Sequence, residues 1–134
     1  MKVTITNKQA IEMINAFAGM QEKKLPRKLS FAIGKNLEAL QAQIYKPYEK
    51  EMQRITRTYE VLDANGNQKV DELRRAIYTD RYAFQDAMNE LLSIENEFEM
   101  HTITEEVLDQ CEKDDKFDIL TAKEELACMR MLGK

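Results

Sequence analysis

Apolar residues recur every three or four positions over residues 28–62, and this row limits the possible folds more than any other feature of the chain. Its members are Leu29, Ile33, Leu37, Leu40, Ile44, Tyr48, Met52, Ile55, Tyr59 and Leu62. Such spacing places side chains on one face of an α-helix. One continuous helix would have about 34 residues and be roughly 50 Å long. A helix of that length needs partner helices, or another subunit, beside it.

Pro47 interrupts this row near its middle. A proline inside a helix removes one amide donor, and its ring here would crowd the carbonyl of Gln43. The cost is about 3 kcal/mol unless a kink relieves it. We therefore predict a kinked long helix, with two separate helices as the alternative.

Asn65-Gly66 follows the row and marks a reversal of the chain. This pair is typical of tight turns that need left-handed backbone. A second helical face follows, formed by Val70, Leu73, Ile77, Phe84, Met88, Leu91 and Leu92. We predict an antiparallel helical hairpin with a short turn. The alternative is a small β-hairpin made by residues 59–62 and 68–70.

The reversal also has the first half of an EF-hand calcium loop. Asp63, Asn65 and Asn67 stand at loop positions one, three and five, which supply oxygen ligands. The sixth position, however, is Gln68 instead of glycine. The twelfth is Arg74, where calcium needs a bidentate glutamate. We therefore predict a turn that binds no metal.

Two short segments alternate in the manner of β-strands, residues 3–6 and residues 98–103. We predict that they pair, and residues 117–119 are a candidate third strand. Helices are expected from Asn7, as the N-cap, to Gly19, and from Thr121, as part of a capping box, to residue 132. The predicted fold class is mostly α, an α+β fold in which residues 1–134 form a single domain.

Composition excludes several classes of protein. The net charge of −4 and the pI near 5.2 argue against a dedicated nucleic-acid-binding protein. Cys111 and Cys128 lack the spacing of a zinc site and are expected to be reduced thiols. The N-terminus lacks the apolar core of a signal peptide, and no apolar run reaches the roughly 18 residues of a membrane span. We therefore expect a cytoplasmic protein without a membrane segment.

Enzyme signatures are missing from the sequence. It has no glycine-rich phosphate loop, GxSxG elbow or HExxH motif. His101 is the single histidine, and no nucleophile stands near it in the sequence. We predict a non-enzyme, with no catalytic residues, no cofactor and no metal.

Basic and aromatic residues interleave in two places, and these residues are the candidate contacts with a partner or ligand. They are Arg74, Arg75, Tyr78, Arg81 and Tyr82 after the reversal, and Tyr45, Tyr48 and Arg54 on the long helix. Such mixtures are typical of protein interfaces and of nucleotide sites. A third interpretation is structural, with the aromatic rings in the core and the basic stems covering its edge.

The order of these elements resembles that of a known family. Lys-Val-Thr-Ile-Thr-Asn at residues 2–7 leads into a helix, and a long charged helix is followed by Asp-Ala-Asn-Gly-Asn at residues 63–67. Asn-Glu-Leu-Leu-Ser-Ile-Glu at residues 89–95 then runs into an alternating strand, before a small helix and a final helix rich in Leu and Met. This arrangement resembles a family of small tailed-phage proteins of unknown function from Gram-positive hosts. The resemblance implies a phage or prophage origin and supplies no catalytic residues.

Two functional hypotheses follow. The first is a non-enzymatic phage or prophage accessory protein in the host cytoplasm. It would act through protein–protein interaction, with a phage or host protein or as a homo-oligomer, because the row over residues 33–62 is more than a compact monomer buries. The alternative is an anti-defence module that binds or sequesters a small nucleotide, or blocks a host defence protein.

Overall fold

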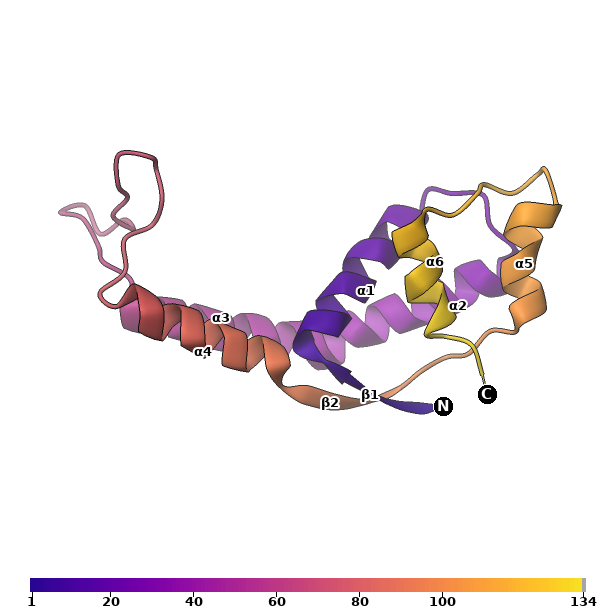
Figure 1. Ribbon diagram of the computed structural model, residues 1–134, viewed down its shortest axis with the longest axis horizontal. Coiled ribbons are helices and arrows are strands. Elements are labelled where there is room, and N and C mark those ends of the chain that lie inside the picture. The colour runs from indigo at the N-terminus through magenta and orange to yellow at the C-terminus, as the bar shows by residue number, and fades with distance from the viewer. Residues whose placement is uncertain (134) are drawn as a thin grey trace.

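The computed structural model describes residues 1–133, which form an elongated molecule of helices with one small sheet (Figure 1). The elements in chain order are β1 (Lys2–Thr6), α1 (Asn7–Met20), α2 (Arg27–Leu40), the π-helical turn η1 (Gln41–Tyr45), α3 (Lys46–Tyr59), α4 (Arg81–Ser93), β2 (Glu95–Glu99), α5 (Glu105–Lys113) and α6 (Ala122–Met129). The prediction of a mostly α fold with a small β element is confirmed.

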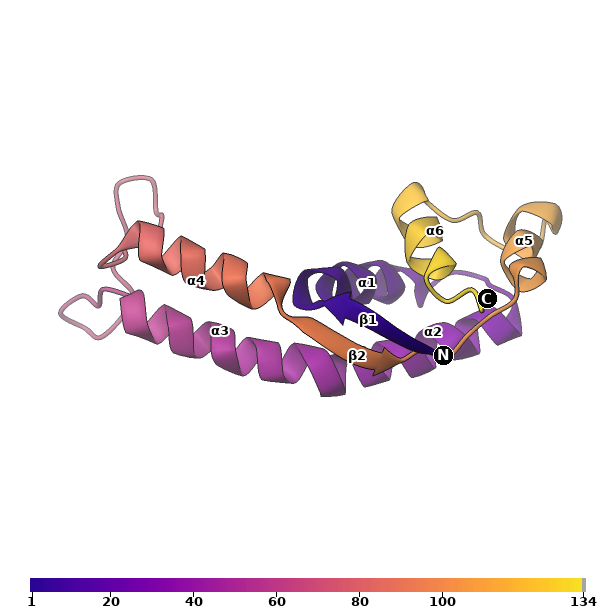
Figure 2. The ribbon, with the colours of Figure 1, turned by 60° about the horizontal axis from the view of Figure 1, so that its bottom comes forward.

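The long helix is continuous over α2, η1 and α3, a joined helix of 33 residues. In η1 the amide of Lys46 donates to the carbonyl of Gln41, five residues earlier. This widened turn lies directly before Pro47, which has no amide to donate, and the helix bends there (Figures 1 and 2). The predicted kinked helix is therefore present, and the alternative of two separate helices is not.

The molecule has two parts, which we call the body (residues 1–45 and 94–133) and the arm (residues 46–93). In the body, α1 packs on α2, α6 and β1, and α5 contacts α2, so that α2 lies along one edge of the body (Figure 2). The fully buried large side chains all belong to the body: Met13, Phe17, Met20, Leu29, Asn36, Leu40, Phe98, Cys128 and Met131. In the arm, α3 and α4 lie side by side and extend away from this core.

The apolar row of the long helix is covered unevenly. From Leu29 to Tyr48 its members are buried, and most of them belong to the core of the body. Beyond that point Met52, Ile55 and Tyr59 are only half-buried, because α4 alone packs on α3. The chain itself therefore buries the first part of the row, and only the part in the arm is incompletely covered.

The sheet consists of β1 and β2 in antiparallel register, with Val3 opposite Phe98. The predicted pairing is correct, but the second strand is Glu95–Glu99 instead of residues 98–103. It ends there because the buried side chain of Asn36 bonds the backbone of His101, donating to its carbonyl and accepting from its amide. A strand over residues 117–119 was predicted wrongly.

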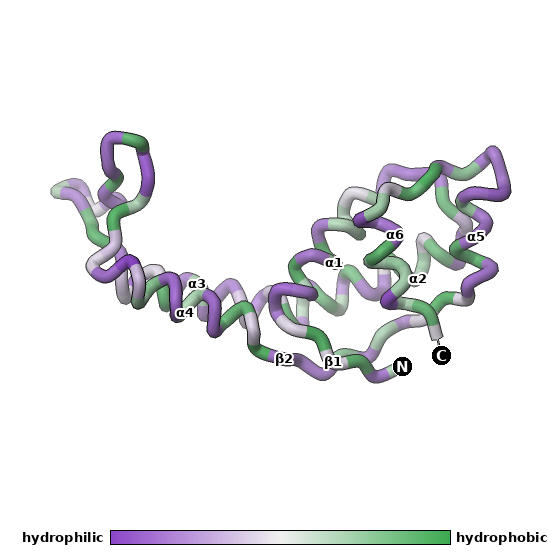
Figure 3. The backbone as a smooth tube through the Cα atoms, in the orientation of Figure 1, coloured by the Kyte–Doolittle hydropathy of each residue, from purple (hydrophilic) through white to green (hydrophobic). Residues whose placement is uncertain are grey.

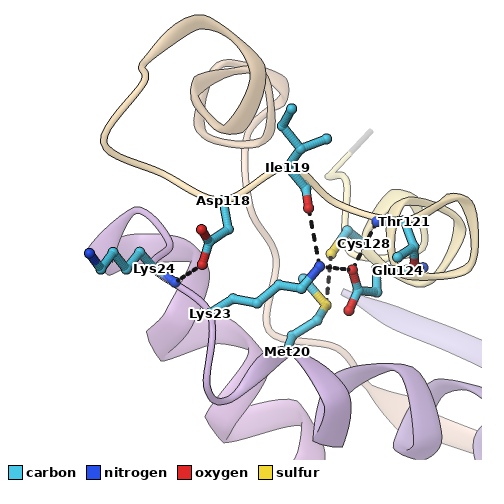
Figure 4. A network of polar contacts seen from close by, with 8 residues as sticks. All are labelled: Met20, Lys23, Lys24, Asp118, Ile119, Thr121, Glu124 and Cys128. Atoms are coloured by element: carbon cyan, nitrogen blue, oxygen red, sulfur yellow. Dashed lines mark hydrogen bonds and ion pairs between the residues drawn. The ribbon is translucent and has the colours of Figure 1, made fainter.

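That segment instead joins a polar network that ties the α1–α2 connection to the α5–α6 connection (Figure 4). Lys23 Nζ donates to Glu124 Oε1 at 2.6 Å and to the carbonyl of Ile119 at 3.1 Å. Asp118 accepts from the amide of Lys24 at 2.7 Å and donates its own amide to the Lys24 carbonyl. Its backbone is thus bonded to a connecting segment, and no strand lies beside it.

Side-chain caps set the helix starts. Thr121 and Glu124 form the predicted capping box at α6. At α1 the N-cap is Thr6 instead of the predicted Asn7, and Gln9 completes its capping box. Asn7 is buried and donates its side-chain amide to the carbonyl of Leu91, which fixes the end of the arm to the body. None of the helices in residues 1–133 is both long enough and apolar enough to cross a membrane.

Candidate interaction surface at the tip of the arm

The distal end of the arm, residues 60–80, replaces the predicted short turn between two helices. Because α4 begins only at Arg81, the predicted helical positions Val70, Leu73 and Ile77 do not lie on a helix. We call this segment the tip. In Figures 1 and 2 it forms two loops beyond the ends of α3 and α4.

A closed ring of three backbone hydrogen bonds organises the tip. The amide of Val61 donates to the carbonyl of Ile77 at 3.3 Å, and the amide of Ile77 donates to the carbonyl of Lys69 at 3.0 Å. The amide of Lys69 completes the ring by donating to the carbonyl of Val61 at 2.7 Å. The three residues are evenly spaced, eight positions apart. Three successive eight-residue units therefore begin at Val61, Lys69 and Ile77, and the third continues into α4.

The β-bridges of the tip follow the same repeat. Leu62 pairs with Gln68 in the first unit. Val70 and Ala76, which lie eight residues after them, pair in the second unit. The third unit runs into α4, so its corresponding residue, Tyr78, pairs back with Glu60 at the end of α3. The first unit thus contains a small β-hairpin around Asn65-Gly66, which was the alternative to a plain helical turn.

The first two units share one loop geometry. Asp63 Oδ1 accepts from the amides of Asn65 and Asn67, at 2.9 and 3.0 Å. Asp71 Oδ1 accepts from the amides of Leu73 and Arg75, both at 2.9 Å. In each loop the aspartate amide also donates to the carbonyl four residues later. Both loops are therefore fixed by their own carboxylate.

The same bonds give Asp63 a structural role in place of the calcium ligation considered for it. Its Oδ1 is already occupied by two amide donors. Within residues 1–133, no three His, Cys, Asp or Glu side chains are grouped so that they could hold a metal ion.

The structure separates the candidate contact residues into three places. Tyr45 and Tyr48 lie at the bend of the long helix with ring centroids 6.0 Å apart, and Tyr48 is buried. Burial, together with the charge of Tyr45, raises the pKa of the Tyr48 hydroxyl. Arg54 is exposed on α3, 3.5 Å from Glu51. Only Arg74, Arg75, Tyr78, Arg81 and Tyr82 lie at or beside the tip.

Two members of this last group are held by neighbouring side chains. The Tyr78 ring stacks on Phe84 with centroids 3.9 Å apart and an interplanar angle of 11°, and Tyr59 meets Phe84 edge-on. Arg75 Nε donates to Asp71 Oδ2 at 3.1 Å. Hydrogen bonds from the backbone amide of Arg75 are the largest cause that lowers the pKa of Asp71. Tyr78 and Arg75 therefore stabilise the tip through these contacts, and the Arg75 side chain remains 60% exposed.

Large apolar side chains are exposed around the tip. Leu73 and Tyr82 are 71% and 84% exposed, and Leu62 and Val70 are about half exposed, at 52% and 50%. We call these four residues the tip surface. Figure 3 shows hydrophobic stretches in this part of the chain, among hydrophilic ones.

Charge in the tip is mixed in sign. Its acids are Glu60, Asp63, Asp71, Glu72 and Asp80, and its bases are Lys69, Arg74 and Arg75, with Arg81 directly after it. A segment of this kind has no strong preference for an anion, so its binding character comes from the apolar side chains. Leu62, Val70 and Leu73 were not among the predicted contacts. The eight-residue repeat, with aspartate third in both VLDANGNQ and KVDELRRA, is the sequence signal that could have revealed the paired loops.

Comparison of the chain with protein-family models, with curated proteins and with solved structures gave no match. The resemblance to small tailed-phage proteins therefore stays a prediction from the sequence.

Proposed function

We propose that the chain is a non-enzymatic accessory protein of a phage or prophage, which acts in the host cytoplasm by binding a partner protein at the tip of its arm. One observation carries this proposal. Leu62, Val70 and Leu73 are exposed on a segment whose backbone is held by its own hydrogen bonds, and Tyr82 is exposed beside it on the first turn of α4.

Exposed apolar groups that are clustered in one part of a protein mark interaction sites more often than scattered ones do. Aromatic anchors are frequent among the residues that dominate binding energy. The carboxylates of Asp63 and Asp71 fix both loops before any partner arrives. Binding would therefore lose little conformational entropy in the tip, which favours affinity.

The partner proposed for the tip surface is a phage or host protein, including a host defence protein. Self-association remains part of the proposal, but fewer apolar side chains are left uncovered for it than the sequence indicated. The chain covers the row from Leu29 to Tyr48 itself, so only Met52, Ile55, Tyr59 and Leu62 remain for a second copy to cover.

The test combines a double substitution with a matched control. Leu73→Ser with Tyr82→Ser removes the two most exposed members of the tip surface. Ile119→Ser with Leu126→Ser removes side chains of the body that are 73% and 63% exposed. Each tagged protein is used to recover binding proteins from infected host cells, and light scattering measures its mass in solution.

We expect the wild type and the control to recover the same partner and the tip variant to lose it, with all three equally stable. Loss of the partner in the control, or its retention in the tip variant, would contradict binding through the tip. A monomeric wild type at high concentration that recovers no partner would overturn the proposed function as a whole.

A further inference from the structure

A second group of basic and aromatic residues lies on the body, along the outward face of α2. Arg27, Phe31 and Lys35 follow one another at four-residue intervals, so they form one row on the helix surface. Phe31 is 56% exposed, and Lys35 Nζ lies 5.6 Å from the centroid of its ring. An exposed phenylalanine between two cations has no role in the core, which lies on the opposite side of α2.

Arg27 and Phe31 of this row, together with Lys28, form one wall of a groove of about 780 Å³, which we call the α2 groove. The opposite wall is the segment that joins β2 to α5, and the buried side chains of Ile103 and Val107 provide an apolar floor. The volume is in the range typical of small-molecule sites.

The wall opposite Phe31 is held in place from inside the body. Asn36 is only 1% exposed, and its side chain bonds the His101 carbonyl at 2.9 Å and the His101 amide at 2.8 Å. The His101 ring thereby meets Phe31 edge-on, with centroids 5.4 Å apart and an interplanar angle of 69°. Both aromatic rings are thus positioned before any ligand enters.

Charge in the α2 groove is opposite to that of the whole chain. Arg27 and Lys28 line it and Lys35 flanks it, whereas Glu105 is the one acidic residue in its lining among residues 1–133. Arg27, Lys28 and Lys35 form no ion pair with any described carboxylate. The chain as a whole carries a net charge of −4, but these cations make the groove locally positive, which favours an anionic ligand.

We propose that the α2 groove binds a nucleotide, with the base against Phe31 and the phosphate at Arg27 and Lys28. A ligand for this groove must combine a flat apolar group, for Phe31 and the floor, with an anionic group for the cations. Arg27 precedes Phe31 by four residues, a rise of about 6 Å along the helix axis. This is close to the reach from a stacked base to its own phosphate. Arginine adds the paired donors that phosphate oxygens accept.

The site is independent of the tip surface, so either proposal can fail alone. The probes are adenosine monophosphate, adenosine and inorganic phosphate, titrated into the full chain by calorimetry and by amide NMR. We expect the nucleotide to bind more tightly than either of its parts and to shift the amide signals of His101 and Thr102. Equal binding of the nucleotide and inorganic phosphate would overturn the proposal, since the base would then contribute nothing.

Matched variants test each role. Phe31→Leu keeps an apolar side chain but removes the ring, and should weaken nucleotide binding roughly 5- to 150-fold, the usual effect of one base-aromatic stack. Phe117→Leu removes a ring on the α5–α6 connection, outside the groove, that also has a lysine near it, with Lys116 Nζ 5.3 Å from its centroid, and should leave binding unchanged. Arg27→Ala should weaken the nucleotide about tenfold or more and leave adenosine unaffected, whereas Lys50→Ala, an exposed cation of α3, should change neither.

Because Phe31, Arg27 and Lys50 are exposed, the variants at these three positions should keep the thermal stability of the wild type. No binding of the nucleotide at millimolar concentration, or binding that persists unchanged in Phe31→Leu or Arg27→Ala, would overturn the assignment.

Discussion

Asp63 and Asp71 hold equivalent places in two consecutive loops, eight residues apart, and each Oδ1 accepts the amides two and four residues later. The loops differ at the residue three positions after the aspartate. It is Gly66, with φ +82°, in the first loop and Arg74, with φ 60°, in the second. A left-handed backbone costs a residue with a Cβ atom roughly 1–2 kcal/mol. The second loop therefore carries strain that the first one avoids.

Substitutions at these two positions should change the stability of the tip in opposite directions. We expect Arg74→Gly to stabilise the tip by about 1 kcal/mol, and Gly66→Ala to destabilise it by a similar amount. No atom lies within 4 Å of a Cβ built at Gly66, so the second effect is one of backbone conformation alone. Hydrogen exchange at the amides of Lys69 and Ile77 measures both effects. Changes of the same sign would contradict the equivalence of the loops.

The second loop should also respond to pH. The amide of Arg75 is the largest cause that holds the pKa of Asp71 below its ordinary value, and the Asp71 side chain is about one-third exposed, at 34%. A group whose pKa is lower in the folded state than in the unfolded state stabilises the folded state fully at pH values above its unfolded-state pKa. This contribution is lost as the pH falls through its folded-state pKa. We therefore expect the loop to loosen in acid, below the ordinary range for aspartate.

Hydrogen exchange at Leu73 and Arg75, corrected for intrinsic rates, follows this loosening. The Asp71→Asn variant serves as the control and should show no pH-dependent change in this window. A wild-type loop whose protection did not change with pH would show that the carboxylate is not what fixes it.

The elements predicted correctly are those that depend on local periodicity. The row over residues 28–62 specifies the long helix because every third or fourth side chain packs on the same side. The alternation around Val3 and Phe98 specifies the sheet in the same way. The tip differs, because its bonds join Val61, Lys69 and Ile77 across intervals of eight and sixteen residues. Val70, Leu73 and Ile77 also fit helical spacing, and the cross-links of the tip override that pattern.

The candidate contacts show a similar limit. Sequence spacing put Arg75 and Tyr78 in one helical region, whereas both lie outside the helices. It did not indicate their neighbours, Asp71 for Arg75 and Phe84 for Tyr78, because the loop geometry of the tip brings these side chains together. The row of Arg27, Phe31 and Lys35 was readable from its four-residue spacing, whereas the wall that His101 forms beside it was not.

The ion pair between Lys23 and Glu124 should contribute to the stability of the body. Burial raises the pKa of Glu124, but the Lys23 ammonium and the Thr121 backbone outweigh it, so the net pKa is lower than usual. Removing one partner leaves a charge with little access to water. We expect Glu124→Leu to lower the free energy of unfolding, measured in urea, by roughly 2–4 kcal/mol. The double variant with Lys23→Met should regain part of that loss. A double variant less stable than Glu124→Leu would contradict this account.

The two thiols should be unreactive in the folded protein. Burial, with smaller contributions from the nearby Cys111, Glu124 and Glu125, raises the pKa of Cys128 to about 12, and burial also raises that of Cys111. Near pH 8, about one Cys128 thiol in ten thousand is then ionised, and the thiolate is the reactive form. We expect iodoacetamide to modify neither thiol until urea unfolds the chain, and to react quickly with an Ala122→Cys variant on the exposed start of α6. Fast modification of Cys128 in the native protein, read by mass spectrometry, would mean that α6 detaches from α1 far more often than the buried contact with Met20 allows.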